Sequence, residues 1–195
     1  SYTIFITTFE LSRIIGAMFY KKSFRRTVMG SNQEYAIKDY EPIVSFVIPC
    51  KNEEKAIEKT ITKCFEADYP KEKLEVIVVN DGSTDKTIDV LKKLEKAFKN
   101  LIVVDWKVNQ GKRHGMREGF QKSKGEIIVQ LDSDSYIDPK TFRGLIAPFK
   151  NPKIGAVCAH TDPENSDTNL LTKMQAGYYF MSFRILKAAE STFLS

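Results

Sequence analysis

The sequence has few cysteines and lacks the glycine-rich motifs of two large nucleotide-binding classes. Its three cysteines, Cys50, Cys64 and Cys158, are odd in number and form no Cys-x-x-Cys pair. A disulfide framework or a zinc site is therefore not expected, and a reducing compartment is indicated. Neither Gly-x-Gly-x-x-Gly nor Gly-x-x-x-x-Gly-Lys-Ser/Thr occurs. Dinucleotide and P-loop sites accordingly lose support.

The composition is otherwise that of a globular protein with one domain. Apolar residues make up 42% of the chain, and its 195 residues are enough to bury a core. The net charge of +5 fits an anionic partner, such as a phosphate-bearing substrate or an acidic membrane surface. A basic solvated face is the plainer interpretation of the same charge. No motif for nucleic-acid binding occurs, so no nucleic-acid partner is expected.

The first 29 residues predict a membrane-associated helix. Residues 2–20 are rich in Ile, Phe, Leu and Met, and a spanning helix needs about 20 such residues. Glu10 and Arg13 interrupt the run, so a helix lying in the membrane interface, or packed on a soluble domain, is also open. The basic residues at 21–26 are typical of a cytoplasmic flank. Residues 30–42 predict a linker, and the domain after it is expected at the membrane on the cytoplasmic side.

From residue 43 onward, short apolar runs alternate with helical patterns. The apolar runs predict five strands, at 43–48, 74–79, 101–106, 126–131 and 154–158. The helical patterns lie at 52–67, 84–99, 112–122 and 139–149. Asn52 is the expected N-cap of the first helix, and Ser83 or Thr84 that of the second. Because the strands are mostly apolar, we expect an α/β, Rossmann-like fold with a mostly parallel sheet and helices on both faces.

The sharpest feature at a strand end is Asp132-Ser133-Asp134, directly after the fourth predicted strand. Ligands of parallel sheets bind at the carboxyl ends of the strands. Two carboxylates this close repel each other unless a cation lies between them. Magnesium suits such a pair, because it keeps several waters and completes its shell with phosphate oxygens. A solvated turn, in which an aspartate caps the next helix, is the alternative.

Two further strand ends suit a nucleotide. Asp81 can accept a hydrogen bond from a base edge, although a plain turn that needs Gly82 for a positive φ is the alternative. Lys112 and Arg113 follow a glycine at a helix start. That geometry suits a diphosphate, because helix N-termini and cations both favour anions. A surface helix with basic residues is the alternative there.

These motifs, in this order, resemble the family-two glycosyltransferases of the GT-A fold. The motifs are Val47-Ile48-Pro49 with Asn52-Glu53-Glu54, the 79–85 segment Val-Asn-Asp-Gly-Ser-Thr-Asp, Gly111-Lys112-Arg113, and Leu131-Asp132-Ser133-Asp134. The nucleotide-sugar-binding domain implied by the resemblance covers residues 43–160. With the basic-flanked start and residues 183–191, the chain looks most similar to the hyaluronan synthases and their chitin synthase relatives.

The resemblance implies an inverting, membrane-associated enzyme that uses a UDP-sugar with Mg²⁺ or Mn²⁺ and extends a growing polysaccharide. Hyaluronan, made of GlcNAc and glucuronic acid, is the first expectation. Chitin synthase or another family-two enzyme, such as dolichyl-phosphate mannose synthase, is the alternative, and a UDP-binding fragment without turnover is the non-enzyme alternative. By position, Asp132 and Asp134 are implied to be catalytic, and Asp134 to be the metal ligand. The implied substrate-binding residues are Pro49, Asn52, Glu53, Asp81, Gly82, Lys112, Arg113, Asp132 and Ser133.

The sequence departs from the family pattern in two places. The usual Asp-Asp-Gly is Asn80-Asp81-Gly82, which leaves the role of Asn80 open. The family's Gln-x-x-Arg-Trp motif is absent, because the only tryptophan is Trp106. We therefore expect the acceptor-side part, with the general base, to lie beyond residue 195. Residues 161–195 predict a loop and an amphipathic helix for packing in a core or against a membrane; the alternative places Gln175, Tyr178 or Tyr179 near the acceptor.

Overall fold

The computed structural model describes residues 11, 15, 40–159, 161–166 and 168–182. The chain divides into two compact units, Ile37–Ala147 and a second of Ser1–Ala36 with Pro148–Ser195. Only Leu11 and Ile15, both helical, are described within the helix predicted at 1–29. Most of the linker at 30–42 and the end of the C-terminal helix lie outside the described residues. Among the helices that are described, none has the length and apolar character needed to cross a membrane.

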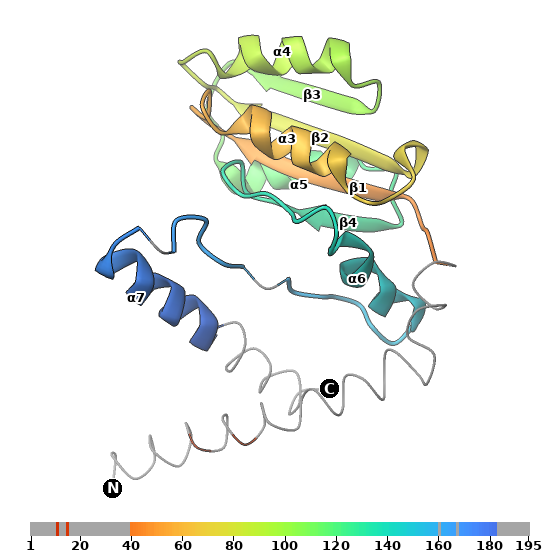
Figure 1. Cartoon of the computed structure of the whole chain (residues 1–195). Coiled ribbons are helices and arrows are strands. Elements are labelled where there is room, and N and C mark those ends of the chain that lie inside the picture. Colours follow the sequence, from red (N-terminus) through yellow and green to blue (C-terminus); the bar gives the residue numbers. More distant parts are fainter. Residues whose placement is uncertain (1–10, 12–14, 16–39, 160, 167, 183–195) are drawn as a thin grey trace, which may run out of the picture. The chain divides into compact units, whose positions relative to one another are not determined.

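A parallel sheet of four strands forms the core of the Ile37–Ala147 unit, in the order β3-β2-β1-β4 (Figure 1). The central strand β1 is buried along its whole length, which explains why its sequence is apolar without alternation. The four strands are β1 (Val44–Cys50), β2 (Leu74–Asp81), β3 (Leu101–Trp106) and β4 (Ile127–Gln130). The parallel sheet and its first four strands are confirmed.

Helices cover both faces of the sheet, as predicted. In Figure 1, α3 (Ile57–Glu66) and α4 (Thr87–Ala97) lie in front of the sheet and α5 (Lys112–Lys122) lies behind it. The chain steps outward from β1 to β2 and β3, and α5 then carries it back across the sheet to β4. The short helices of this unit are η2 (Lys71–Lys73) and α6 (Phe142–Ile146). A third, η3 (Ala147–Lys150), begins at the last residue of the unit.

Alternate residues of β1 pack against the two helical layers. The ring of Phe46 lies 5.3 Å from that of Phe142 in α6. Its neighbour Val47 points the other way, toward α5, where a Cβ built on Gly119 would lie 2.3 Å from Val47 Cγ1. A Cβ built on Gly115 would likewise lie 3.2 Å from Pro49 Cβ. Two glycines one helical turn apart therefore allow α5 to lie unusually close to the central strand.

The helix starts and the fifth strand differ from the prediction. Asn52 does not cap α3, which begins at Ile57, and its own φ of +56° is left-handed. The second helix, α4, begins at Thr87 rather than after Ser83 or Thr84. The strand predicted at 154–158 is wrong, because these residues form no strand and are half-buried or exposed. A short apolar run forms a strand only when a neighbouring strand pairs with it.

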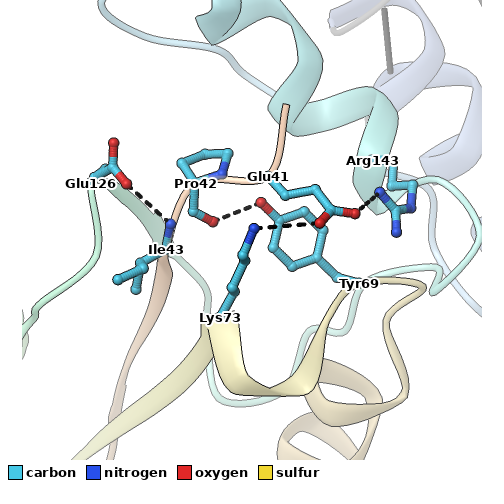
Figure 2. A network of polar contacts seen from close by, with 7 residues as sticks. All are labelled: Glu41, Pro42, Ile43, Tyr69, Lys73, Glu126 and Arg143. Atoms are coloured by element: carbon cyan, nitrogen blue, oxygen red, sulfur yellow. Dashed lines mark hydrogen bonds and ion pairs between the residues drawn. The ribbon is translucent and has the colours of Figure 1, made fainter. Parts of the chain in front are cut away.

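Charged and polar side chains fasten the start of β1 (Figure 2). Glu41 forms ion pairs with Arg143 of α6 at 2.7 Å and with Lys73 at 3.4 Å. The Tyr69 hydroxyl donates a 2.7 Å hydrogen bond to the carbonyl of Pro42. The Arg143 guanidinium holds the pKa of Glu41 below its usual value. These contacts tie residues 41–43 to the rest of the sheet unit.

In the other unit, the helix predicted after residue 161 is present as α7 (Leu170–Tyr179). Asn169 and Thr172 form a capping box at its start, each side chain bonding the backbone N–H of the other. The apolar stripe of Leu170, Leu171, Met174 and Tyr178 is exposed.

Candidate functional site

The strand order places the topological switch point of the sheet, where a ligand crevice is expected, at the carboxyl ends of β1 and β4. In open parallel sheets, ligands bind where the chain reverses its direction of winding. Here the reversal lies between β1, which leads to β2 on one side, and β4, which lies on the other. Pro49 stands near the end of β1, and Asp132 follows β4 by two residues. The predicted carboxylates therefore stand at the switch point of the sheet.

Lys112 and Asp132 meet at this crevice. Lys112 is the first residue of α5, and its Nζ lies 2.6 Å from Asp132 Oδ1. The Gln130 amide donates a second hydrogen bond, of 3.1 Å, to the same oxygen. Both charged side chains are about half exposed, at 57% for Lys112 and 50% for Asp132. A cation and a carboxylate are thus held together in the open, where a bound ligand can reach them.

Asp81 holds the loop that leads into α5. Its two carboxylate oxygens accept hydrogen bonds from the backbone N–H groups of Gln110, at 2.6 Å, and Gly111, at 2.9 Å. Asp81 is 4% exposed. Its neighbour Gly82 has φ +65°, and a Cβ there would lie 2.7 Å from the Asn109 backbone nitrogen. The two residues therefore fix the position of the loop just before Lys112, which the sequence interpretation of Asp81 as a base reader did not foresee.

Asn52 and Glu53 join the loop after β1 to the loop after β2. The Asn52 side-chain oxygen accepts a 2.8 Å hydrogen bond from the backbone N–H of Thr84. In return, the backbone N–H of Asn52 donates to the Ser83 hydroxyl at 2.9 Å. The Glu53 backbone N–H donates to the hydroxyl of Thr87 at 2.8 Å. These contacts make one rigid rim from the two loops predicted to line a nucleoside pocket.

Asp85 and Glu54 extend this rim. Asp85 accepts a 3.3 Å hydrogen bond from the Glu54 backbone N–H, and Glu54 accepts one of 3.0 Å from the backbone N–H of Lys86. Burial alone would raise the pKa of Asp85, but hydrogen bonds from Thr87 and Glu54 outweigh it and lower the pKa. Both acidic residues stand in the sequence motifs quoted above, but neither was given a role.

Asn80 acquires a role from its neighbours. It is 2% exposed, and its amide donates a 2.8 Å hydrogen bond to Asp105 at the end of β3. Its side-chain oxygen accepts from the Ser83 hydroxyl. The ion pair with Lys107 holds the pKa of Asp105 below its usual value, so Asp105 is ionised and needs a donor. A second aspartate at position 80 would bring two carboxylates together, whereas the asparagine supplies the donor.

A hydrogen bond from α3 holds the backbone of the turn at 132–134. The hydroxyl of Thr60, which is 1% exposed, donates a 2.9 Å hydrogen bond to the carbonyl oxygen of Ser133. Asp134 is exposed, and within the described part of the chain no hydrogen bond or ion pair engages its carboxylate. The turn therefore has a fixed backbone and a carboxylate that is accessible to a ligand.

Arg113 lies on a different face of α5 from Lys112. With Met116, Arg117, Phe120 and Gln121 it lines a shallow hollow on the outer side of the helix. Consecutive residues of a helix point about 100° apart, so this is the expected consequence of their spacing. The structure thus brings Lys112, but not Arg113, to Asp132.

The donor set suits a metal that is shared with a substrate. No group of three or more His, Cys, Asp or Glu residues in the described ranges is arranged to hold a metal by itself. The two aspartates of the 132–134 turn match a magnesium-type ion, which takes its other ligands from phosphates and water. Burial raises the pKa of Cys50, the last residue of β1, to about 12, so its thiol is protonated in the metal-free protein.

Comparison with known families covers most of the chain. A family model described as glycosyl transferase family 2 matches residues 45–193. That range begins in β1 and includes the switch-point crevice and α7. The match therefore includes every residue of the candidate site described above.

The similar proteins include two polysaccharide synthases and a mannosyltransferase. A poly-β-1,6-N-acetyl-D-glucosamine synthase of Staphylococcus epidermidis is 29% identical over 97% of the chain and 45% of its own length. The synthase of the same name from Staphylococcus aureus is 30% identical over 76% of the chain and 35% of its own length. A solved mannosyltransferase from Pyrobaculum calidifontis, in complex with GDP-Man and Mn²⁺, has a TM-score of 0.62 and 26% identity, over 81% of this chain and 46% of that one. The chain thus spans less than half the length of these proteins.

Proposed function

The chain belongs to glycosyl transferase family 2, with a GT-A-like fold, and on this premise we propose that it transfers a hexose from a UDP-sugar to a growing polysaccharide, with inversion at the sugar carbon. The observation that carries the proposal is the meeting of Lys112 and Asp132 at the topological switch point, beside an accessible Asp134. Cationic and metal-binding groups at one crevice suit a nucleoside diphosphate.

Each side of the crevice has a part in binding the donor. The rim formed by Asn52, Glu53 and the loop after β2 would hold the nucleoside, with Asp81 and Gly82 at its base. Lys112 would neutralise the diphosphate as negative charge develops on it. Asp134 would hold Mg²⁺ or Mn²⁺, which supplies Lewis-acid stabilisation of the leaving diphosphate when it is bound.

N-acetylglucosamine is the sugar that we propose. The two similar synthases named above are poly-β-1,6-N-acetyl-D-glucosamine synthases, whereas the resemblance to hyaluronan synthases finds no support among the relatives described. The hyaluronan alternative differs from this proposal because it consumes UDP-glucuronate as well. The chitin alternative differs in the linkage formed between the sugars. Incubating the complete enzyme with radiolabelled UDP-GlcNAc, with and without UDP-glucuronate, separates them by the composition and linkage of the labelled polymer.

We also propose that the enzyme works at a membrane, with this domain on the cytoplasmic side. The apolar, basic-flanked segment at residues 2–26 supports the proposal. Fractionation of cells that express the complete chain, with and without residues 1–29, tests it. A protein that stays in the membrane fraction without this segment would speak against the segment as an anchor.

Replacing Asp134 with asparagine tests the site itself. We expect Asp134→Asn in the complete enzyme to lower the polymerisation rate at least about 100-fold, because removing one preorganised electrostatic group has this effect in other enzymes. Asp138→Asn is the matched control, because Asp138 lies four residues further along the chain and its carboxylate accepts a hydrogen bond from the nearby backbone N–H of Lys140. Equal activity of the two variants would refute the assignment of Asp134.

A further inference from the structure

One carboxylate oxygen in the crevice serves two donors of different kinds. Asp132 Oδ1 accepts from the charged Lys112 Nζ at 2.6 Å and from the neutral Gln130 amide at 3.1 Å. The two donors come from different elements, Lys112 from the start of α5 and Gln130 from the last residue of β4. Their freedom to leave Asp132 therefore differs.

Gln130 is the less mobile donor. Its backbone is paired with Val47 of the central strand, so the base of its side chain is fixed in the sheet. Lys112 reaches Asp132 with a long side chain that is 57% exposed, and such ion pairs in contact with solvent are weak. Both side chains are exposed. The longer, charged lysine can turn to another anion without a change in the backbone, whereas the shorter Gln130 side chain starts from a strand only two residues before Asp132.

A divalent cation and Lys112 cannot both be favoured at Asp132. A metal ion held by Asp134 would bring a second positive charge close to the Asp132 carboxylate, and two cations beside one carboxylate repel each other. A diphosphate brings negative charge that attracts both cations. In the protein without nucleotide, the Lys112–Asp132 ion pair therefore weakens metal binding. When a diphosphate is bound, the ion pair no longer weakens it.

We propose that Lys112 is an exchangeable counter-ion, which neutralises Asp132 until the donor binds and then transfers to the donor's diphosphate, while Gln130 keeps Asp132 in position. The proposal rests on the proposed function and adds a binding order to it. Metal and nucleotide are expected to bind as a pair, because each weakens the hold of Lys112 on Asp132. The exchange of Lys112 would thus make metal binding depend on whether the sugar nucleotide is bound.

Calorimetric titration of the purified complete chain tests the exchange through binding alone. We expect Lys112→Met to bind Mn²⁺, without nucleotide, about two- to fivefold more tightly than the wild type, because a competing exposed ion pair is removed. At saturating Mn²⁺, the same variant should bind UDP about tenfold or more weakly, because a charged hydrogen bond to phosphate is lost. Titration with uridine, which has no phosphate, should differ less than twofold between variant and wild type.

Two control variants isolate the charge at this position. Lys122→Met removes the same charge from the other end of α5, where Lys122 pairs with Glu118 at 3.3 Å, and should change neither titration. Lys112→Arg keeps the charge and should bind Mn²⁺ alone as weakly as the wild type does. If Lys112→Met binds Mn²⁺ alone no better than the wild type, the counter-ion role is overturned while the donor site stands. If the wild type binds no UDP even with Mn²⁺, the proposed function fails and the exchange fails with it.

Discussion

Replacing Gly82 with alanine tests how the turn after β2 sets the position of the loop before Lys112. Gly82 has φ +65°, in the region that favours glycine, and it touches the backbone of the 108–111 loop. The same loop is held from below by the Asp81 carboxylate. A side chain at position 82 would therefore displace Val108 and Asn109, although the Asp81 carboxylate holds the next two residues of the same loop by hydrogen bonds.

The magnitude has two parts. A left-handed alanine costs about 1–2 kcal/mol relative to glycine. The added Cβ would also lie 2.7 Å from the Asn109 nitrogen and 3.0 Å from the Val108 carbonyl carbon, well inside ordinary contact at 3.4–4 Å. Both are backbone atoms, which cannot rotate away, and overpacking of this kind costs about 1–3 kcal/mol. We expect Gly82→Ala to lower the free energy of unfolding by about 2–5 kcal/mol.

Urea denaturation of three alanine variants separates the two parts. With an m-value of about 2 kcal/mol/M, the Gly82→Ala midpoint should fall by about 1–2.5 M. Gly111→Ala shares the positive φ, at +94°, and its ψ of 150° lies in a region that is nearly restricted to glycine, so it should lose about 1–3 kcal/mol although its Cβ would meet nothing within 4 Å. Gly144→Ala in α6 has neither problem and should be neutral or gain about 0.5–1 kcal/mol. A loss for Gly82→Ala of less than about 1 kcal/mol, the least that its backbone conformation alone should cost, would refute the clash with the loop.

Three other features make predictions of their own. The Arg143 guanidinium lowers the pKa of Glu41 in the folded protein. The ion pair therefore stabilises the fold at a pH above the pKa of Glu41 in the unfolded chain, and this stabilisation is lost as the pH falls through the lower, folded-state pKa. Glu41→Gln should therefore lose less stability than the wild type when urea midpoints are compared from about pH 5 to about pH 3. Burial raises the pKa of Cys50 and Cys64 to about 12. A thiol reagent at about pH 8 should thus modify only exposed Cys158 in the native protein, counted by intact mass, and modification of a buried thiol would contradict this. Asn52→Gly should cost less stability than Asn52→Ala in urea, because the φ of +56° suits glycine, and the reverse order would exclude backbone strain as the cause.

The strands could be predicted because burial on both faces leaves a local signature. The central strand β1 is buried throughout, so its run of β-branched and apolar residues was sufficient evidence. The run at 154–158 has a similar composition but forms no strand. The difference is a partner: β1 pairs with β2 and β4, and pairing depends on segments distant in sequence. Composition predicted the tendency to form a strand but could not predict the pairing.

The helix starts were misplaced because the expected capping residues form hydrogen bonds with loops distant in sequence instead of with the start of a helix. Asn52 and Ser83 carry the side chains that favour an N-cap. In the structure they bond to each other's loops, Asn52 to Thr84 and Ser83 to Asn52, across some thirty residues of sequence. The Asp81 carboxylate is similarly committed to backbone groups 29 and 30 residues away. Local patterns identified the polar residues of the crevice, but their hydrogen-bond partners follow from the way the sheet winds.

The pairing of Lys112 with Asp132 depends on the side of the sheet to which β4 is added. A strand that continued outward beyond β3 would lie about 20 Å from the present β4, since neighbouring strands are about 4.8 Å apart. Its crossover helix would then lie on the face of α3 and α4, because such connections are right-handed. The sequence holds one signal against that arrangement. Gly115 and Gly119 give α5 a face without side chains, which fits closely over Pro49 and Val47 of the central strand. A helix that lies across β1 on the free face can only lead to a strand on the far side of β1, and that places the Asp132 carboxylate at the same crevice as the start of α5.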